Sequence, residues 1–141
     1  MPRIPLWIAV VPWLWLGCSD HITTSTDMVF DEEEPAPGRK VTFTSIEQEV
    51  FGVYCAVPGC HASSQYPDLS SGRAYASIVD MPSTAGLALV APGRPDSSYL
   101  YLKVTGAPGI RGERMPYGGP PLPQATVEAV RAWIERGAPN D

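Results

Sequence analysis

The chain has 141 residues and a formal net charge of −5 at pH 7, which allows one domain with appendages but not two full-sized domains. The acidic balance excludes the basic footprint of a nucleic-acid-binding protein. The 13 glycines and 16 prolines exclude a helical bundle or a coiled coil, because both residue types interrupt long helices. The three cysteines, Cys18, Cys55 and Cys60, cannot all be paired within one chain.

The first 17 residues have the pattern of a secretory signal. Arg3 is their only charged residue, and the apolar run over 4–16 is shorter than the roughly 20 residues of a transmembrane helix. The run leads into Gly17 and Cys18, which resemble a bacterial lipobox. The resemblance implies a lipoprotein-type signal peptide over 1–17 and a lipid anchor on Cys18. By the same resemblance, Ser19 after this cysteine implies a periplasm-facing position on the outer membrane, with cell-surface exposure as the other option. The alternative is an ordinary signal peptide and a free Cys18.

Residues 18–40 are expected to form an acidic flexible tether. They hold six acidic side chains against two basic ones and show no apolar periodicity. His21 is interpreted as a solvated side chain of this tether. The remaining residues, 41–141, are expected to form the folded domain, whose charge is nearly balanced with nine acidic and seven basic side chains.

Three stretches of the domain, 44–54, 71–79 and 126–136, have the periodicity of amphipathic helices. The first opens with Thr44 and Glu47 in a capping-box pattern. The apolar positions expected on the buried faces are Ile46, Val50, Val53 and Tyr54 in the first stretch, Ala74, Tyr75, Ile78 and Val79 in the second, and Val127, Val130, Trp133 and Ile134 in the third.

The region between the second and third helices is harder to assign. Apolar and polar residues alternate over 97–104 as in a strand, but Asp96 and Ser97 could equally cap a short helix. Residues 105–123 are so rich in glycine and proline that they predict a long loop, and such loops in compact domains are usually functional. After the last helix, Gly137 predicts a helix end. The expected fold is mostly α, with three to five short helices and long Gly/Pro-rich loops.

Cys55 and Cys60 are followed at once by His61, the arrangement of c-type haem attachment. In such a site each thiol forms a thioether with a haem vinyl group, and the adjacent imidazole is the proximal iron ligand. Four residues separate the cysteines where two are usual. The extra residues must bulge outward, and Pro58-Gly59 is a turn-forming pair that suits this bulge.

Cytochromes c commonly complete the iron coordination with a methionine sulfur. Met115 lies in the predicted long loop and is followed by a proline, which restricts the local backbone. Met81 directly follows the second predicted helix. Met115 is the expected distal ligand, and Met81 is the rival, interpreted mainly as a packing residue.

Landmarks along 44–138 resemble the class I cytochrome c family, in particular the small monohaem domains of bacterial lipoproteins and planctomycete-type cytochromes. They are the first helix, the Cys-x4-Cys-His motif, the segment Val90-Ala91-Pro92-Gly93-Arg94-Pro95-Asp96-Ser97-Ser98-Tyr99-Leu100, Met115-Pro116, and Trp133-Ile134-Glu135-Arg136-Gly137-Ala138.

The resemblance implies one covalent haem c, attached by Cys55 and Cys60 and ligated by His61 and Met115. It also implies first and last helices that cross, and single-electron transfer to a redox partner protein rather than enzymatic catalysis. Residues expected to pack around the haem and the helix crossing are Phe51, Leu100, Val130, Trp133 and Ile134. Arg94, Arg114 or a tyrosine is expected to pair with the haem propionates.

Other interpretations remain open at this point. Cys55 and Cys60 could form a disulfide in a haem-free extracytoplasmic interaction module, since secreted cysteines are normally oxidised. A catalytic haem domain would need an open distal site, which Met115 argues against. A zinc site needs about four ligands, and the two cysteines with His61 fall one short.

Overall fold

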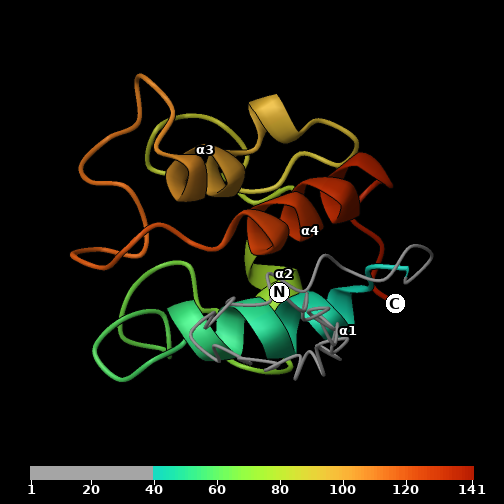
Figure 1. Ribbon diagram of the computed structural model, residues 1–141, viewed down its shortest axis with the longest axis horizontal. Helices are drawn as coiled ribbons and strands as arrows, with labels where there is room; N and C mark the ends of the chain where they lie inside the picture. The colour runs from blue at the N-terminus through green and yellow to red at the C-terminus, as the bar shows by residue number, and fades with distance from the viewer. Residues whose placement is uncertain (1–39) are drawn as a thin grey trace, which may run out of the picture. The chain divides into compact units, whose positions relative to one another are not determined.

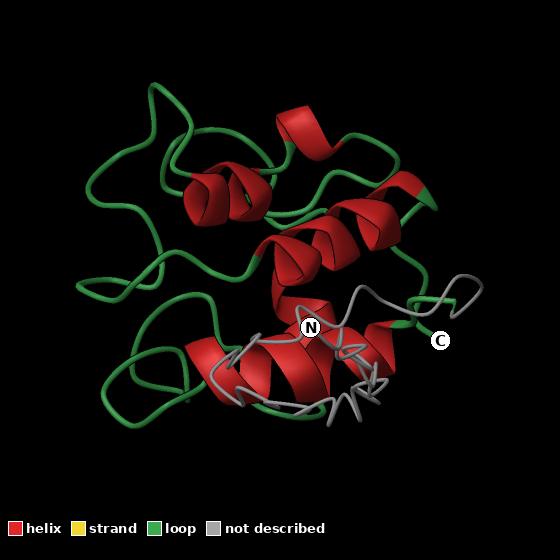
Figure 2. Ribbon diagram, viewed as in Figure 1, coloured by secondary structure: helices red, strands yellow, loops and turns green. Residues whose placement is uncertain are grey.

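The computed structural model describes residues 40–141, which belong to one compact unit. The predicted signal peptide (1–17), Cys18, His21 and all but the last residue of the predicted tether lie outside the described residues. The described part is mostly helical, as predicted (Figure 2). Between residues 40 and 141 there is no β-strand, only isolated bridges. In the same range no helix is both long and apolar enough to span a membrane.

Short helical segments build this part of the chain (Figure 1). In chain order they are α1 (Phe43–Ser45), the π-helix η1 (Ile46–Cys55), α2 (Ala74–Ile78), the 3₁₀-helix η2 (Pro95–Ser97), α3 (Tyr99–Thr105) and α4 (Gln124–Glu135). The helices predicted over 71–79 and 126–136 are confirmed as α2 and α4 with shifted ends. The ambiguous stretch 97–104 forms α3, not a strand. Residues 106–123 contain no helix, which confirms the predicted loop.

The first helix uses a different cap from the predicted one. The Thr42 hydroxyl accepts a hydrogen bond from the Ser45 N–H, and the Ser45 hydroxyl accepts one from the Thr42 N–H, each at 3.1 Å. The predicted capping box of Thr44 and Glu47 is therefore wrong. The Glu47 carboxylate instead accepts a hydrogen bond from the Gly72 N–H at 2.8 Å, which joins η1 to the segment before α2.

The widening of the first helix into a π-helix changes which residues it buries. Backbone bonds to the fifth residue back, such as that from the Ala56 N–H to the Phe51 carbonyl at 2.7 Å, lengthen the helical repeat. Phe51 is therefore only 1% exposed, whereas Val53 is 57% exposed. The predicted buried stripe is correct at Ile46 and Val50 and wrong at Val53.

The last helix ends as the sequence predicts. Gly137 has a φ of 92° and donates its N–H to the Ile134 carbonyl at 2.9 Å. The Ala138 N–H donates to the Trp133 carbonyl at 3.0 Å, which completes a Schellman motif. Ala138 has no solvent exposure, so this turn directs the chain back into the core.

The first and last helices lie against each other (Figure 1). The ring centroids of Phe43 and Trp133 are 5.5 Å apart, and the Trp133 indole N–H donates to the Pro139 carbonyl at 3.0 Å. The Thr44 N–H donates to the Asp141 carbonyl at 3.0 Å, which joins the final residues to α1. All residues that the sequence analysis placed around the helix crossing are buried, namely Phe51, Leu100, Val130, Trp133 and Ile134.

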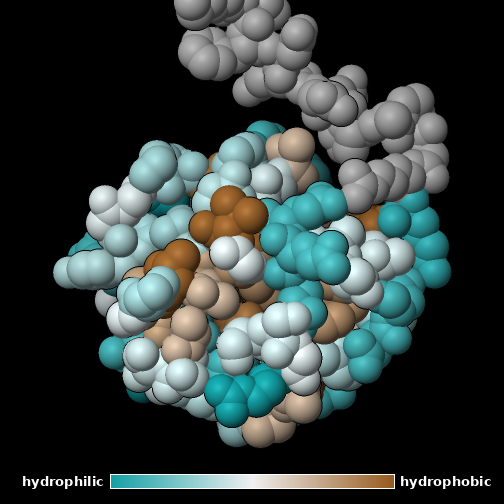
Figure 3. Space-filling model, turned by 90° about the horizontal axis from the view of Figure 1, so that it is seen from below, coloured by the Kyte–Doolittle hydropathy of each residue, from teal (hydrophilic) through white to brown (hydrophobic). Residues whose placement is uncertain are grey.

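Large apolar side chains also reach the surface of the described part. The face in Figure 3 shows separate brown patches among polar residues. The exposed large hydrophobic residues between 40 and 141 are Val53, Tyr66, Met81, Leu87 and Tyr117.

Candidate cofactor-binding site

A cavity of about 570 Å³ lies among η1, α3, α4 and the two long loops. This volume lies within the range of pockets that hold small molecules and cofactors. The loops that follow η1 and α3 extend to the same side of the helices (Figures 1 and 2). The apolar lining residues include Val50, Phe51, Val57, Leu69, Leu89, Leu100, Val104 and Val130.

All four predicted haem-binding residues, Cys55, Cys60, His61 and Met115, line this one cavity. Cys55 is the last residue of η1, and Cys60 and His61 lie in the loop that follows this helix. Met115 is contributed by the loop between α3 and α4. The fold therefore brings together residues that are more than fifty positions apart in the sequence.

The four-residue spacer between the cysteines forms a tight turn. The Cys60 N–H donates to the Val57 carbonyl at 3.0 Å, and Gly59 has a φ of 82°. A positive φ at the third position, after a proline, is typical of a type II turn. Beyond the turn, the His61 N–H donates to the Cys55 carbonyl at 3.1 Å. The predicted turn at the Pro-Gly pair is confirmed, and the spacer leaves both sulfur-bearing residues on the cavity.

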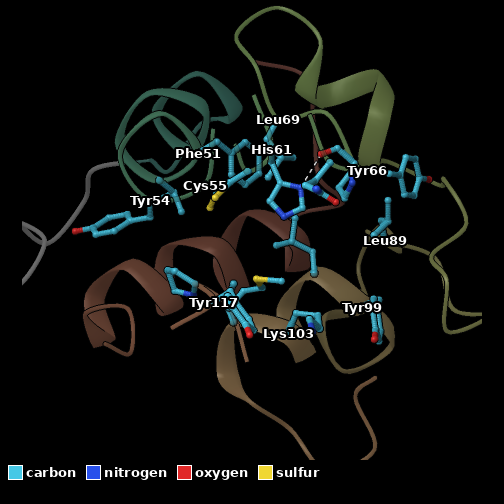
Figure 4. A pocket seen from close by; sticks show the side chains of 18 of the residues that line it. Phe51, Tyr54, Cys55, His61, Tyr66, Leu69, Leu89, Tyr99, Lys103 and Tyr117 are labelled. Carbon is cyan, nitrogen blue, oxygen red and sulfur yellow. Dashed lines mark hydrogen bonds between the residues drawn. The ribbon is translucent and has the colours of Figure 1, made fainter. Parts of the chain in front are cut away.

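The imidazole of His61 is oriented by the loop that follows it. Its Nδ1 lies 2.8 Å from the Pro67 carbonyl oxygen (Figure 4). Because a carbonyl only accepts, Nδ1 carries the proton, and Nε2 of the neutral ring keeps its lone pair. The His61 carbonyl accepts a hydrogen bond from the Leu69 N–H at 2.8 Å, which fixes the backbone as well. A histidine held in this way is prepared to act as a metal ligand through Nε2.

The two methionines are in different environments. Met115 is half-buried, packs against the core and donates its N–H to the Lys103 carbonyl at 2.9 Å. Met81 is 38% exposed and is not among the residues that line the cavity. A soft thioether on the cavity wall is thus provided by Met115.

The two cysteine thiols are free in this structure, and they differ in exposure. Cys60 is exposed, whereas Cys55 is half-buried. Burial, together with the charge of the neighbouring Cys60, raises the pKa of Cys55 to about 11. Cys55 is therefore a protonated thiol at neutral pH. Within residues 40–141 no group of three or more His, Cys, Asp or Glu side chains is arranged to hold a metal ion.

The cationic side chains on the cavity are not those that the sequence analysis named. Lys103 and Arg111 line it, whereas Arg94 and Arg114 do not. In Figure 4, Cys55 lies to the left of His61, and Lys103 and Tyr99 lie below it. Four tyrosines also line the cavity, namely Tyr54, Tyr66, Tyr99 and Tyr117. The lining of the cavity thus combines two thiols with two cationic side chains.

Sequence reasoning missed three polar groups of this site: the Pro67 carbonyl, Lys103 and Arg111. Lys103 belongs to a stretch that could be read as a strand, and Arg111 lies in the long loop. The Arg111 N–H donates to the buried Tyr99 hydroxyl at 2.9 Å, and this bond directs the loop across the cavity. No local pattern in the sequence signals such a contact.

Comparison with known proteins identifies no family: no family model, curated protein or solved structure matches the chain.

Proposed function

We propose that this protein is a membrane-tethered, extracytoplasmic c-type cytochrome that transfers single electrons through one covalently attached haem c. The observation that carries the proposal is the convergence of Cys55, Cys60, His61 and Met115 on one largely apolar cavity. The fold in this proposal is a small class I cytochrome c-like domain, and the haem would occupy the cavity that η1, α3, α4 and the long loops line.

The residues present fit the size and chemistry of a haem group. A planar apolar ring needs an apolar cavity, and its vinyl groups need two thiols near one edge. Its carboxylates need cations or hydroxyls, and Lys103, Arg111 and four tyrosines line the same cavity. When bound, the haem iron supplies a one-electron couple between its ferric and ferrous states.

Each of the four predicted haem-binding residues has a defined part in this proposal. Cys55 and Cys60 attach the group by thioethers, and His61 presents Nε2 because Nδ1 donates to the Pro67 carbonyl. Met115 supplies a thioether sulfur as the distal ligand, which raises the reduction potential of a haem. With His61 and Met115 both held as ligands, the group would be suited to electron transfer rather than to substrate chemistry.

The location of the protein belongs to the same proposal. Cys18 is lipidated and becomes the N-terminal residue when residues 1–17 are removed, and the acidic tether separates the domain from the outer membrane on its periplasmic side. One cysteine then carries lipid and two carry haem, which accounts for the odd number of three. The partner is a redox protein reached within the length of the tether.

The proposal is tested by expressing the chain in a periplasm with haem-maturation machinery and recording a pyridine haemochrome spectrum. We expect the spectrum of a haem with both vinyl groups saturated. A Cys55→Ser or Cys60→Ser variant should show the spectrum of a single thioether. Ser97→Ala, outside the cavity, is the matched control. A chain without haem, and with Cys55 and Cys60 joined in a disulfide, would replace this proposal by the interaction module.

The axial ligand is tested separately with two methionine variants. Met115→Ala should abolish the methionine-to-iron charge-transfer band near the red end of the spectrum and lower the reduction potential. Met81→Ala should leave both unchanged, because Met81 does not line the cavity. The opposite result would assign the distal position to Met81.

A further inference from the structure

The loop that carries Met115 is held by side chains and has no helix or strand of its own between residues 106 and 123. Arg114 provides the first set of contacts. Its guanidinium donates to the carbonyls of Met115 at 3.3 Å, Gly119 at 3.0 Å and Pro120 at 3.4 Å. One side chain therefore joins both ends of the turn that follows Met115.

Lys103 of α3 provides the second set. Its backbone carbonyl accepts the N–H of Met115 at 2.9 Å. Its ammonium group donates to the Arg111 carbonyl at 2.9 Å and also to the Glu113 carbonyl. The segment before Met115 is thus bound to one residue of a helix, while the segment after it is bound by Arg114.

The packing of Arg114 depends on Gly106 at the end of α3. A Cβ atom at Gly106 would lie 2.9 Å from Cδ and 3.2 Å from Cγ of Arg114, and the first distance is so short that the Arg114 side chain would have to shift. The missing side chain of Gly106 therefore leaves the space in which the Arg114 stem lies. Gly109, in the same loop, has a similar positive φ and nothing within 4 Å of such an atom.

We propose that Arg114 is a positioning residue that, together with Lys103, holds Met115 at the cavity in the geometry of an axial ligand. Arg114 does not line the cavity, so it acts on the site through the loop carbonyls. This inference rests on the proposed function in one respect, namely that the group that Met115 binds is a haem iron. Without these contacts, the loop would have to be ordered each time the thioether binds, and part of the binding free energy would be lost to that ordering.

The first test measures the methionine–iron band of the haem-loaded protein as a function of pH. Hydrogen bonds from charged donors are the stronger class, so loss of three in Arg114→Met should shift the equilibrium towards released Met115 about tenfold or more. The midpoint pH at which the band disappears should fall by about one unit. Arg94→Met removes an exposed arginine away from the cavity and is the control for charge. A midpoint for Arg114→Met equal to that of Arg94→Met would overturn the proposal.

The second test perturbs Arg114 without changing it. Gly106→Ala should lower the midpoint pH at which the band disappears. Gly109→Ala introduces a similar backbone strain but no contact with Arg114, so it should leave the midpoint pH near that of the wild type. In an Arg114→Met background, Gly106→Ala should have little additional effect. Equal midpoints for the two glycine variants would contradict the role of the Gly106 space.

Amide hydrogen exchange separates this proposal from the proposed function. The Met115 N–H, bound to the Lys103 carbonyl, should exchange about tenfold faster or more in Arg114→Met than in Arg94→Met. This readout follows the loop whether or not haem is attached. Failure of haem attachment with faster exchange would refute the cytochrome and keep the role of Arg114. Attachment of haem with unchanged exchange would refute the role of Arg114 alone.

Discussion

The hydroxyl of Ser98 is a buried polar anchor of the segment that leads into α3, and its removal has a calculable cost. Ser98 has no solvent exposure; its Oγ accepts from the Ala91 N–H at 2.9 Å and donates to the Arg94 carbonyl at 2.8 Å. Ala91 is 2% exposed, so Ser98→Ala leaves its N–H without a partner in the interior. Such a loss costs about 1–3 kcal/mol. We expect unfolding to require about 2 kcal/mol less, with Tm lower by about 10 °C.

Urea denaturation followed by far-ultraviolet circular dichroism measures this difference. The segment from Ala91 to Ser98 is joined to α4, because the Gly93 N–H donates to the Ile134 carbonyl at 2.7 Å. Weakening this segment should therefore lower the free energy of global unfolding. Ser97→Ala is the matched control, because that residue is half-buried and lies next in the chain. Its cost should stay within about 0.5 kcal/mol. An unfolding free energy for Ser98→Ala equal to that of Ser97→Ala would refute the reasoning.

Two further predictions address the acid limit of stability and the register of η1. A hydrogen bond from Lys40, together with other donors, lowers the pKa of Asp141 from 3.8 to about 2. The ionised Asp141 carboxylate therefore stabilises the fold above pH 3.8, and this contribution is lost as the pH falls through 2. Asp141→Asn should flatten the acid side of a curve of unfolding free energy against pH, measured by urea denaturation. Phe51→Ala should cost about 3–5 kcal/mol in the same assay and Val53→Ala about 0.5 kcal/mol or less. Equal costs at these two positions would contradict the π-helical register.

Elements with a regular repeat could be predicted from the sequence. α4 has the period of an α-helix, and its predicted face, from Val127 to Ile134, is buried as expected. Its end at Gly137 follows from local chemistry, since glycine adopts the positive φ of a Schellman motif at low cost. Both inferences depend only on neighbouring residues.

The first helix could be predicted to exist but not in its correct register. An α-helical period places Val53 inside, whereas the π-helical repeat buries Phe51 and leaves Cys55 half-buried. Both registers contain apolar residues, so the pattern alone does not choose between them. The capping box was predicted in the wrong place for a related reason, because Thr42 and Thr44 are both suitable N-cap residues. Thr42 caps the helix, whereas the Thr44 N–H donates to the Asp141 carbonyl in a tertiary contact.

The candidate site could be predicted where its residues are adjacent, as in Cys60 and His61, or marked by a proline, as in Met115. Residues whose role depends on the path of a long loop could not be predicted from the sequence. Arg111 reaches the cavity because its N–H donates to the Tyr99 hydroxyl, and Lys103 of α3, which also lines the cavity, donates to the Arg111 carbonyl. Arg114 was expected at a propionate, and the structure instead uses its guanidinium on the carbonyls around Met115.

The central claim is that one haem is covalently bound through Cys55 and Cys60. The most direct test is the intact mass of residues 18–141 isolated from a periplasm that matures c-type haem, followed by sequencing of the peptide around His61. We predict an increase by the mass of one haem on the peptide that contains both cysteines, with no thiol left to alkylate. A mass lower by two hydrogens, with the same two cysteines joined in a disulfide, would contradict the account.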